Sequence, residues 1–154
     1  MSNQWNYPEQ HMYSQRNPLW SGVHLGTSSA TIGGQGCVVT AVAYILSRKL
    51  LRDVSPLNFV EWCNKNGGFN KDGLLYWDTV RRFSNGALQR TFNPIHKYTC
   101  VWTNFAGINH LVVALRNPRT GKVDLMMNPW LKEGNQVQLL SSLPRSIKGE
   151  VWFS

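Results

Sequence analysis

Three cysteines and four histidines carry most of the nucleophilic and acid–base chemistry available to this 154-residue chain. Among them, Cys37 has the most informative position. It follows the glycine-rich turn of residues 33–36 and precedes a run that is apolar on every side, which predicts a buried helix over residues 38–52. A helix N-terminus stabilises a thiolate through its dipole and its free N–H groups. Position alone supports a nucleophilic thiolate and an inert core thiol equally well.

His110 is the histidine best placed to serve as a general base for Cys37. It opens the most apolar strand that the sequence predicts, over residues 110–115, and follows the small polar Asn109. A ring at the mouth of a buried strand can reach a cleft while its neighbours anchor the sheet. A hydrogen-bonded structural histidine is the competing interpretation. The other three histidines are less suitable because they lie in irregular segments: His11, His24 and His96.

Asn128 is a candidate for orienting the His110 ring and fixing its tautomer. Residues 122–128 are expected to return beside the histidine strand after a turn at residues 117–121. Folding the two strands about that turn brings Asn128 within about one residue of His110. A strict offset of one residue puts two side chains on opposite faces of a sheet, so their contact requires a bulge beside Gly121.

Acyl-transfer chemistry also needs hydrogen-bond donors where negative charge develops on the substrate. The backbone N–H of Cys37 is one such donor, since it lies at the start of the predicted helix. The second would be a side-chain amide from the N-terminal segment. Gln15 and Gln35 are both candidates for this role.

The remaining patterns predict helices in the first half of the chain and strands in the second. Residues 1–35 are rich in turn formers and are expected to form an irregular arm. Ser55-Pro56 predicts an N-capped helix that ends before Gly67-Gly68, and Asp72 predicts the N-cap of a third helix that ends at Phe83. Further strands are expected over residues 97–103, 136–140 and 150–153. Helices followed by antiparallel strands form an α+β plan, here a single domain over residues 1–154.

The chain is strongly basic, with sixteen Lys and Arg against eight Asp and Glu and a formal charge of +8. These charges are spread along the sequence without a nucleic-acid motif, so we expect a solvated basic surface and no nucleic-acid partner. The cysteines lack zinc spacing, although Cys63 and Cys100 could form a disulfide. No apolar run approaches the roughly 20 residues of a membrane span, and the first residues do not form a signal peptide. We therefore expect synthesis in the cytoplasm and no membrane partner.

Four segments of the chain, taken in order, carry a pattern that recurs in one known family. The first runs from Tyr13-Ser14-Gln15 through Asn17-Pro18-Leu19-Trp20 and Leu25-Gly26-Thr27-Ser28 to Gly36-Cys37-Val38-Val39-Thr40-Ala41. The others are Gly67-Gly68-Phe69 with Leu75-Tyr76-Trp77, Asn109-His110-Leu111-Val112-Val113, and Met127-Asn128-Pro129-Trp130. Over residues 13–130 they resemble a branch of the papain-like cysteine peptidases. That branch is typified by the domains that remove double-glycine leaders from bacteriocins, and it includes bacterial and phage-borne relatives.

This resemblance implies a papain-like α+β fold, in which a buried helix carrying Cys37 packs on an antiparallel sheet carrying His110 and Asn128. It also implies that Cys37 is the nucleophile, paired as a thiolate with a His110 imidazolium, and that Asn128 orients the ring. Gln15, rather than Gln35, takes the oxyanion role. Relatives commonly have Asp-Pro where this chain has Asn128-Pro129, and a neutral amide stabilises an imidazolium less than a carboxylate does. The implied mechanism requires no metal and no organic cofactor.

The implied activity is that of a thiol protease or amidase, a hydrolase acting on a peptide or on peptidoglycan. Peptidoglycan cross-links, a leader peptide and a phage structural precursor are all compatible substrates. The alternative is a papain-like domain that serves as a structural or interaction module with little or no catalysis, for example a virion protein of a bacteriophage. Protein partners in a phage particle or a cell-wall complex would then replace the substrate.

Overall fold

The computed structural model describes residues 10–92 and 98–154, and within them it contains four α-helices and a six-stranded sheet. The helices are α1 (Ile32–Gln35), α2 (Cys37–Leu50), α3 (Pro56–Lys65) and α4 (Asp78–Phe83). The strands are β1 (Arg90–Thr91), β2 (Tyr98–Phe105), β3 (Ile108–Leu115), β4 (Leu125–Met127), β5 (Val137–Leu139) and β6 (Arg145–Phe153), with the short 3-10 helix η1 (Leu140–Ser142) before β6. The sheet order is β1-β6-β2-β3-β4-β5, and every pair of neighbours is antiparallel. The predicted α+β class is confirmed.

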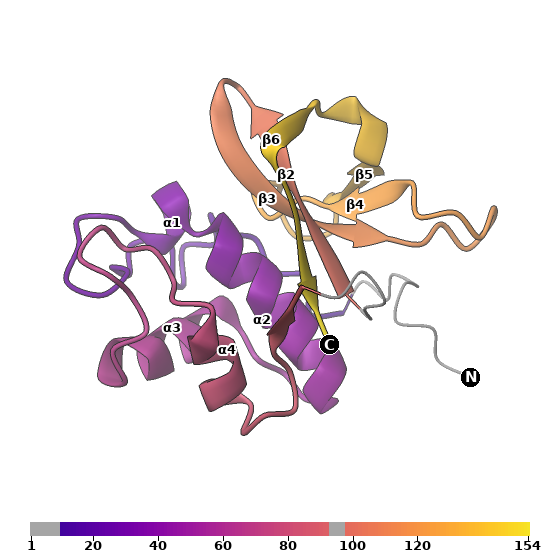
Figure 1. The fold of residues 1–154 in the computed structure, drawn as a ribbon. Helices are drawn as coiled ribbons and strands as arrows, with labels where there is room; N and C mark the ends of the chain where they lie inside the picture. The colour runs from indigo at the N-terminus through magenta and orange to yellow at the C-terminus, as the bar shows by residue number, and fades with distance from the viewer. Residues whose placement is uncertain (1–9, 93–97) are drawn as a thin grey trace.

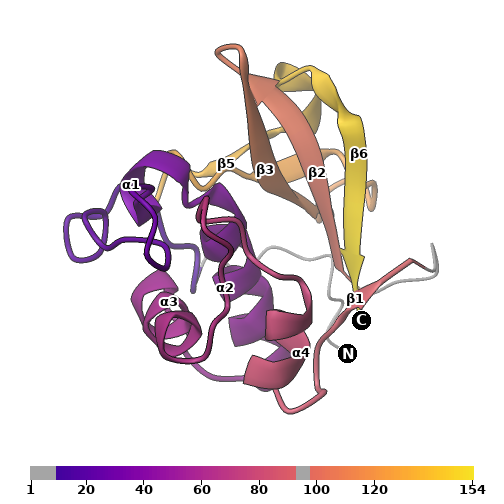
Figure 2. The ribbon, with the colours of Figure 1, turned by 60° about the vertical axis from the view of Figure 1, so that its left-hand side comes forward.

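The helices gather on one side of the strands, with α2 next to the sheet and α3 and α4 on the far side of α2 (Figures 1 and 2). Every α2 residue from Val39 to Ser47 is buried. Val42 and Ile45 belong to the same apolar core as Leu111 and Val113 of β3. The helix predicted over residues 38–52 is thus confirmed, with bounds shifted by one or two residues.

Strand β3 separates two apolar clusters, because successive side chains of a strand point to opposite faces of the sheet. Leu111, Val113 and Leu115 pack in the main core with α2. Val112 and Ala114 pack on the other face, with a small cluster drawn from β2, β4 and η1: Val101, Met126 and Leu140. His110 is two residues before Val112 in β3, so its side chain points toward the same second face of the sheet.

Helix α3 is capped as predicted, since Ser55 Oγ accepts the Asn58 N–H and the Asn58 side chain accepts the Ser55 N–H. The predicted start of the third helix is wrong, because α4 begins at Asp78. Asn70 explains the difference. Its Oδ1 accepts the backbone N–H of Asp72, which folds this segment into a turn and leaves Asp72 capping no helix.

The other strands lie near their predicted positions but differ in length. Strand β2 extends the first of them to Phe105, while Lys97 lies outside the described residues. Strand β3 begins at Ile108, so His110 is its third residue and not its first. The return strand is shorter than residues 122–128, the strand over 136–140 is shorter by two residues, and β6 begins at Arg145, five residues before the predicted 150–153. The two-residue β1 was not predicted, because two residues carry no periodic signal.

The N-terminal arm is irregular from residue 10 to Thr31, and it then forms α1, which the sequence did not predict. Thr31 Oγ1 caps this short helix by accepting the Gly34 N–H. Trp20 anchors the arm in the main core, where its Nε1–H donates to the Ser14 carbonyl.

All three cysteines are free thiols, so the disulfide considered for Cys63 and Cys100 is not formed. In the part of the chain that the structure describes, none of the helices combines the length and the apolar character that crossing a bilayer needs.

Candidate active site

Cys37 is the first residue of α2, and its position depends on the glycine before it. A Cβ atom on Gly36 would lie 2.2 Å from the Ile32 carbonyl oxygen, a distance that no side chain tolerates. Gly36 therefore allows α1 to run directly into α2, with only one residue between the two helices. This tight connection places the Cys37 backbone N–H at the start of the buried helix, as the sequence predicted.

A cavity of about 360 Å³ contains most of the predicted site residues. Cys37, His110 and Gln15 all line it, together with Gln35. These side chains come from separate segments: Gln15 from the arm, Gln35 from the end of α1, Cys37 from the start of α2 and His110 from β3. Cys37 is 8% exposed and His110 is 5% exposed, so each reaches the cavity from a buried position.

Asn128 lies behind the His110 ring, with His110 Nε2 2.7 Å from Asn128 Oδ1. The register of β3 against β4 explains this contact. Val113 pairs with Met127, and continuing the same register puts position 110 opposite position 130. Asn128 is then a diagonal neighbour on the same face as His110, within reach of its ring.

The hairpin between β3 and β4 contains a one-residue shift in strand register, as the contact between Asn128 and His110 requires. The Asn117 N–H donates to the Lys122 carbonyl, and the next cross-strand pair joins Leu115 to Leu125. From the first of these contacts to the second, the chain before the turn spans two residue steps, from Asn117 to Leu115. The chain after the turn spans three, from Lys122 to Leu125. The extra residue shifts the register by one position and brings Asn128 to the face that carries His110.

The protonation of His110 follows from a backbone donor nearby. The Trp130 N–H donates to Asn128 Oδ1 at 3.0 Å, which identifies that end of the amide as the oxygen. An oxygen can only accept, so His110 Nε2 must carry the proton in their 2.7 Å bond. The Asn128 nitrogen points the other way and donates to Gln138 Oε1 at 3.2 Å. The neutral ring therefore has its lone pair on Nδ1, the atom that can accept a proton.

Burial sets the charge of both groups. It raises the pKa of the Cys37 thiol above its usual 9.0, while the backbone N–H groups of Leu111, Val38 and Cys37 and the Lys148 ammonium act in the opposite direction. Burial also lowers the pKa of His110 below its usual 6.5, against the effect of the Asn128 hydrogen bond. Both shifts favour a neutral thiol beside a neutral imidazole. They argue against the thiolate–imidazolium pair that the resemblance implied for the resting protein.

Gln15 is held in the wall of the cavity that Cys37 also lines. Its backbone N–H donates to the Pro129 carbonyl at 2.8 Å, which ties the arm to the loop that follows Asn128. Its Nε2 makes one long bond of 3.4 Å to the Gly33 carbonyl, so a second hydrogen remains for another acceptor. Gln35 is exposed, and its Oε1 accepts the Thr31 N–H, so it serves the turn that precedes Cys37.

Aromatic side chains form much of the cavity wall. The Phe105 ring lies 5.3 Å from the His110 ring and 6.3 Å from the Trp130 ring, measured between centroids. Trp102 also lines the cavity, whereas Trp20 is in the core. Tryptophan side chains thus contribute both to the cavity wall and to the core.

Sequence reasoning missed two polar residues at this site. Lys148 lines the cavity from β6, and Gln138 of β5 holds the Asn128 amide. Lys148 precedes the strand that the sequence predicted, so no pattern placed it near Cys37. The alternation of the predicted strand at residues 136–140 could have paired Gln138 with Asn128, if the partner strand had been known.

The remaining histidines are not part of this cavity in the described residues. His11 Nδ1 lies 3.2 Å from Asp53 Oδ1, and His24 Nδ1 lies 3.0 Å from the Ser28 carbonyl. His96 is outside the described residues. Across residues 10–92 and 98–154, no three His, Cys, Asp or Glu side chains gather closely enough to hold a metal ion.

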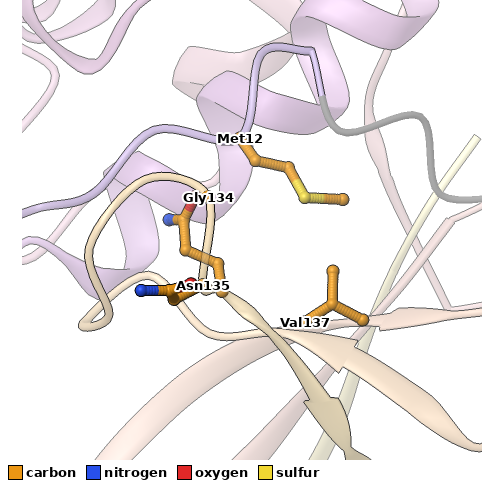
Figure 3. A pocket seen from close by; sticks show the side chains of 5 residues that line it. Met12, Gly134, Asn135 and Val137 are labelled. Carbon is orange, nitrogen blue, oxygen red and sulfur yellow. The ribbon is translucent and has the colours of Figure 1, made fainter.

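A second cavity, of about 310 Å³, lies where the arm meets the loop before β5. Figure 3 shows Met12 and Val137 at this opening, with Gly134 and Asn135 on the loop. Its fifth lining residue, Gln136, accepts the Asn128 N–H through its carbonyl oxygen at 2.9 Å. None of these five described residues has a nucleophilic or basic side chain, so they do not form a second catalytic centre. The backbone of Gln136 instead helps to hold Asn128 in place.

Comparison with family models, with curated proteins and with solved structures finds no match for this chain. A functional conclusion therefore depends first on the geometry of the described residues.

Proposed function

We propose that this protein is a cysteine hydrolase with a papain-like fold, which cleaves an amide bond of a peptide or of peptidoglycan. The observation that carries the proposal is the hydrogen-bond chain at His110. Trp130 identifies the Asn128 oxygen, that oxygen holds the Nε2 proton, and Nδ1 keeps a free lone pair on a ring that lines the same cavity as the Cys37 thiol. A histidine that only stabilises the fold has no need of a basic nitrogen beside a cavity.

The mechanism follows from these atoms. His110 Nδ1 takes the proton of Cys37 Sγ as the sulfur attacks the substrate carbonyl carbon and the carbonyl electrons move to oxygen. The Cys37 N–H and Gln15 Nε2 donate to that oxygen. When the tetrahedral intermediate collapses, the C–N bond breaks and Nδ1 gives its proton to the leaving amine. Water then attacks the thioester, loses its proton to Nδ1, and releases Cys37 with that proton returned to the sulfur.

The resemblance to leader-cleaving peptidases and their bacterial and phage-borne relatives supports this function and suggests its setting. Compatible substrates are a leader peptide, a peptidoglycan cross-link and a phage structural precursor. The basic charge of +8 agrees with anionic surroundings such as a cell wall or a virion.

A comparison of three purified forms tests the proposal: the wild type, Cys37→Ala and Cys63→Ala. Each is incubated with a bacterial proteome digest and with isolated peptidoglycan, and the products are identified by mass spectrometry. Cys63 is a buried thiol that does not line the cavity, so its variant is the matched control. Products made by the wild type and Cys63→Ala, but not by Cys37→Ala, would support the hydrolase. Identical profiles from all three forms would overturn it.

A papain-like structural or interaction module is the second candidate, and one observation favours it. The raised pKa of Cys37 and the lowered pKa of His110 leave little thiolate at neutral pH in the free protein. A module of this kind would bind protein partners, for example in a virion, without cleaving them. Incubation with peptide aldehydes at pH 7 separates the two functions, because an aldehyde presents a carbonyl carbon to the sulfur. An enzyme should form an adduct at Cys37, whereas a binding module should form none at Cys37, Cys63 or Cys100.

A further inference from the structure

The mouth of the candidate active site combines exposed apolar side chains with one positive charge. Leu74 and Ile108 line the cavity although they are 64% and 69% exposed. Large apolar side chains left in water at the rim of a pocket often mark a surface that a ligand covers. The wall behind them is aromatic, formed by Trp102, Phe105 and Trp130. The cavity therefore suits an apolar segment of peptide.

Lys148 contributes a positive charge to the lining of this largely apolar cavity. Among the described residues that line the cavity, Lys148 is the one with a permanent charge. Its Nζ lies 4.9 Å from the centroid of the Trp102 ring, so the ammonium lies over the cavity wall although the residue is exposed to solvent. Strand β2 pairs with β3 at Thr103 and His110, and with β6 at Thr103 and Arg145. Lys148 lies between Arg145 and Glu150, where the register of β6 against β2 shifts. This irregular segment brings Lys148 to the cavity that His110 also lines.

The same cavity has no acidic counterpart. The described residues that line it include neither Asp nor Glu. The nearby carboxylate of Glu150 is engaged by Arg145, at 3.9 Å. Lys148 is exposed to solvent and consequently has its charge available for a ligand. A carboxylate of a ligand that enters the cavity can meet the ammonium at the cavity rim.

We propose that Lys148 makes the site selective for peptides that carry an acidic side chain beside an apolar residue, close to the bond to be cleaved. This inference rests on the proposed hydrolase function and specifies its substrate class. The positive charge of the whole chain assists it, since the charge attracts acidic peptides before they bind.

The test uses matched peptide pairs. Cleavage sites are first mapped in a proteome-derived peptide library, and the best sequence is then made with Glu or Gln at the position nearest Lys148. We expect a kcat/KM ratio of roughly two to five in favour of Glu, as for an exposed ion pair. The ratio should fall to about one in Lys148→Gln, recover in Lys148→Arg, and drop below one in Lys148→Glu. Any effect of Lys148 on the Cys37 thiol acts equally on both peptides and cancels in the ratio.

Two controls separate this inference from general charge effects. Lys122→Gln removes one positive charge from the exposed hairpin turn, away from the cavity, and should leave the ratio unchanged. Raising the salt concentration should weaken the wild-type preference, because ions screen the pair. A C-terminal acid and amide version of each peptide shows whether a main-chain carboxylate is recognised in place of the side chain, a result that would contradict the proposal.

The outcomes for the inference and for the proposed function are distinct. Cys37-dependent cleavage with a Glu/Gln ratio near one, or a ratio that Lys148→Gln does not alter, would overturn the acidic specificity and leave the hydrolase intact. Absence of any Cys37-dependent cleavage across the library would overturn both.

Discussion

Replacing Asn128 by aspartate tests whether the resting Cys37–His110 pair is neutral. In the variant, the oxygen that accepts the His110 Nε2 proton would carry negative charge at the same short distance, 2.7 Å in the wild type. The Trp130 N–H could still donate to it, and the Gln138 amide could turn its nitrogen toward the new carboxylate. The main effect should therefore be electrostatic, a rise in the pKa of His110.

The size of the shift follows from the distance and the burial. Two unit charges about 4 Å apart interact by about 4 kcal/mol at an effective dielectric constant of about 20. That energy corresponds to roughly three pKa units, at about 1.36 kcal/mol per unit. Position 128 is fully buried, so the carboxylate loses hydration and part of this gain. We expect a net rise of about one to three units.

The direction of the pH change distinguishes a neutral pair from an ion pair. In a neutral pair, the proton gained at low pH goes to His110, so the added carboxylate raises the pKa of the acid limb of kcat/KM and leaves the alkaline limb in place. In an ion pair the imidazole is already charged in the active form. The carboxylate would then raise the pKa of the alkaline limb alone.

NMR titration of the imidazole carbon and nitrogen signals measures the same quantity without a substrate. Wild-type His110 should titrate below 6.5, and Cys37→Ala should change its pKa little, because a neutral thiol contributes no charge. Asn135→Asp adds a carboxylate at an exposed position of the nearby loop and should leave His110 unchanged. A wild-type His110 that is protonated at pH 7, with a pKa that falls in Cys37→Ala, would refute the neutral pair.

Two further substitutions test how the site is positioned. Gly36→Ala would place a methyl group 2.2 Å from the Ile32 carbonyl oxygen and should destabilise the fold by about 1–3 kcal/mol in chemical denaturation. Gly22→Ala is the control and should cost little, because no atom lies within 4 Å of its Cβ; equal stabilities of the two variants would contradict the tight α1–α2 connection. Gln138→Leu removes the hydrogen-bond partner of the buried Asn128 nitrogen, so it should lower the stability by about 1–3 kcal/mol and also lower kcat/KM. Gln138→Glu keeps the accepting oxygen and should restore most of the stability. A Leu variant with wild-type values would exclude the positioning role.

The parts of this fold that the sequence predicted are those with strong local signals. The length and alanine content of the apolar run after Cys37 favour a buried helix, and the Ser55-Pro56 pair marks a capped helix start. Asp72 shows where local signals mislead. It has the side chain of an N-cap, but Asn70 bonds the backbone of the same segment first and folds it into a turn. Competition between two short polar side chains is settled by the surrounding chain, not by residue type.

The contact between His110 and Asn128 could not be predicted from the sequence, for a different reason. Both residues could be selected from the sequence, but their meeting depends on one extra residue between Lys122 and Leu125. The side chains of a strand alternate with a period of two, so a shift of one residue decides whether the amide faces the ring or the opposite side of the sheet. No residue type in that segment specifies the shift. Lys148 and Gln138 were missed for a related reason, since sheet order brings them to the site from strands distant in sequence.

The burial of the Cys37–His110 pair links reactivity to occupancy of the cavity. A thiol that stays protonated reacts slowly with oxidants and alkylating agents, because the thiolate is the reactive form. In the proposed hydrolase a bound peptide would change the energetics, since its carbonyl oxygen could take the negative charge that the sulfur would otherwise hold, with the Gln15 amide and the Cys37 N–H as donors. Proton transfer to His110 Nδ1 can then accompany formation of the C–S bond and need not precede it. On this argument, the hydrolase and the binding module differ in one respect: whether the bound segment presents a carbonyl carbon to the sulfur.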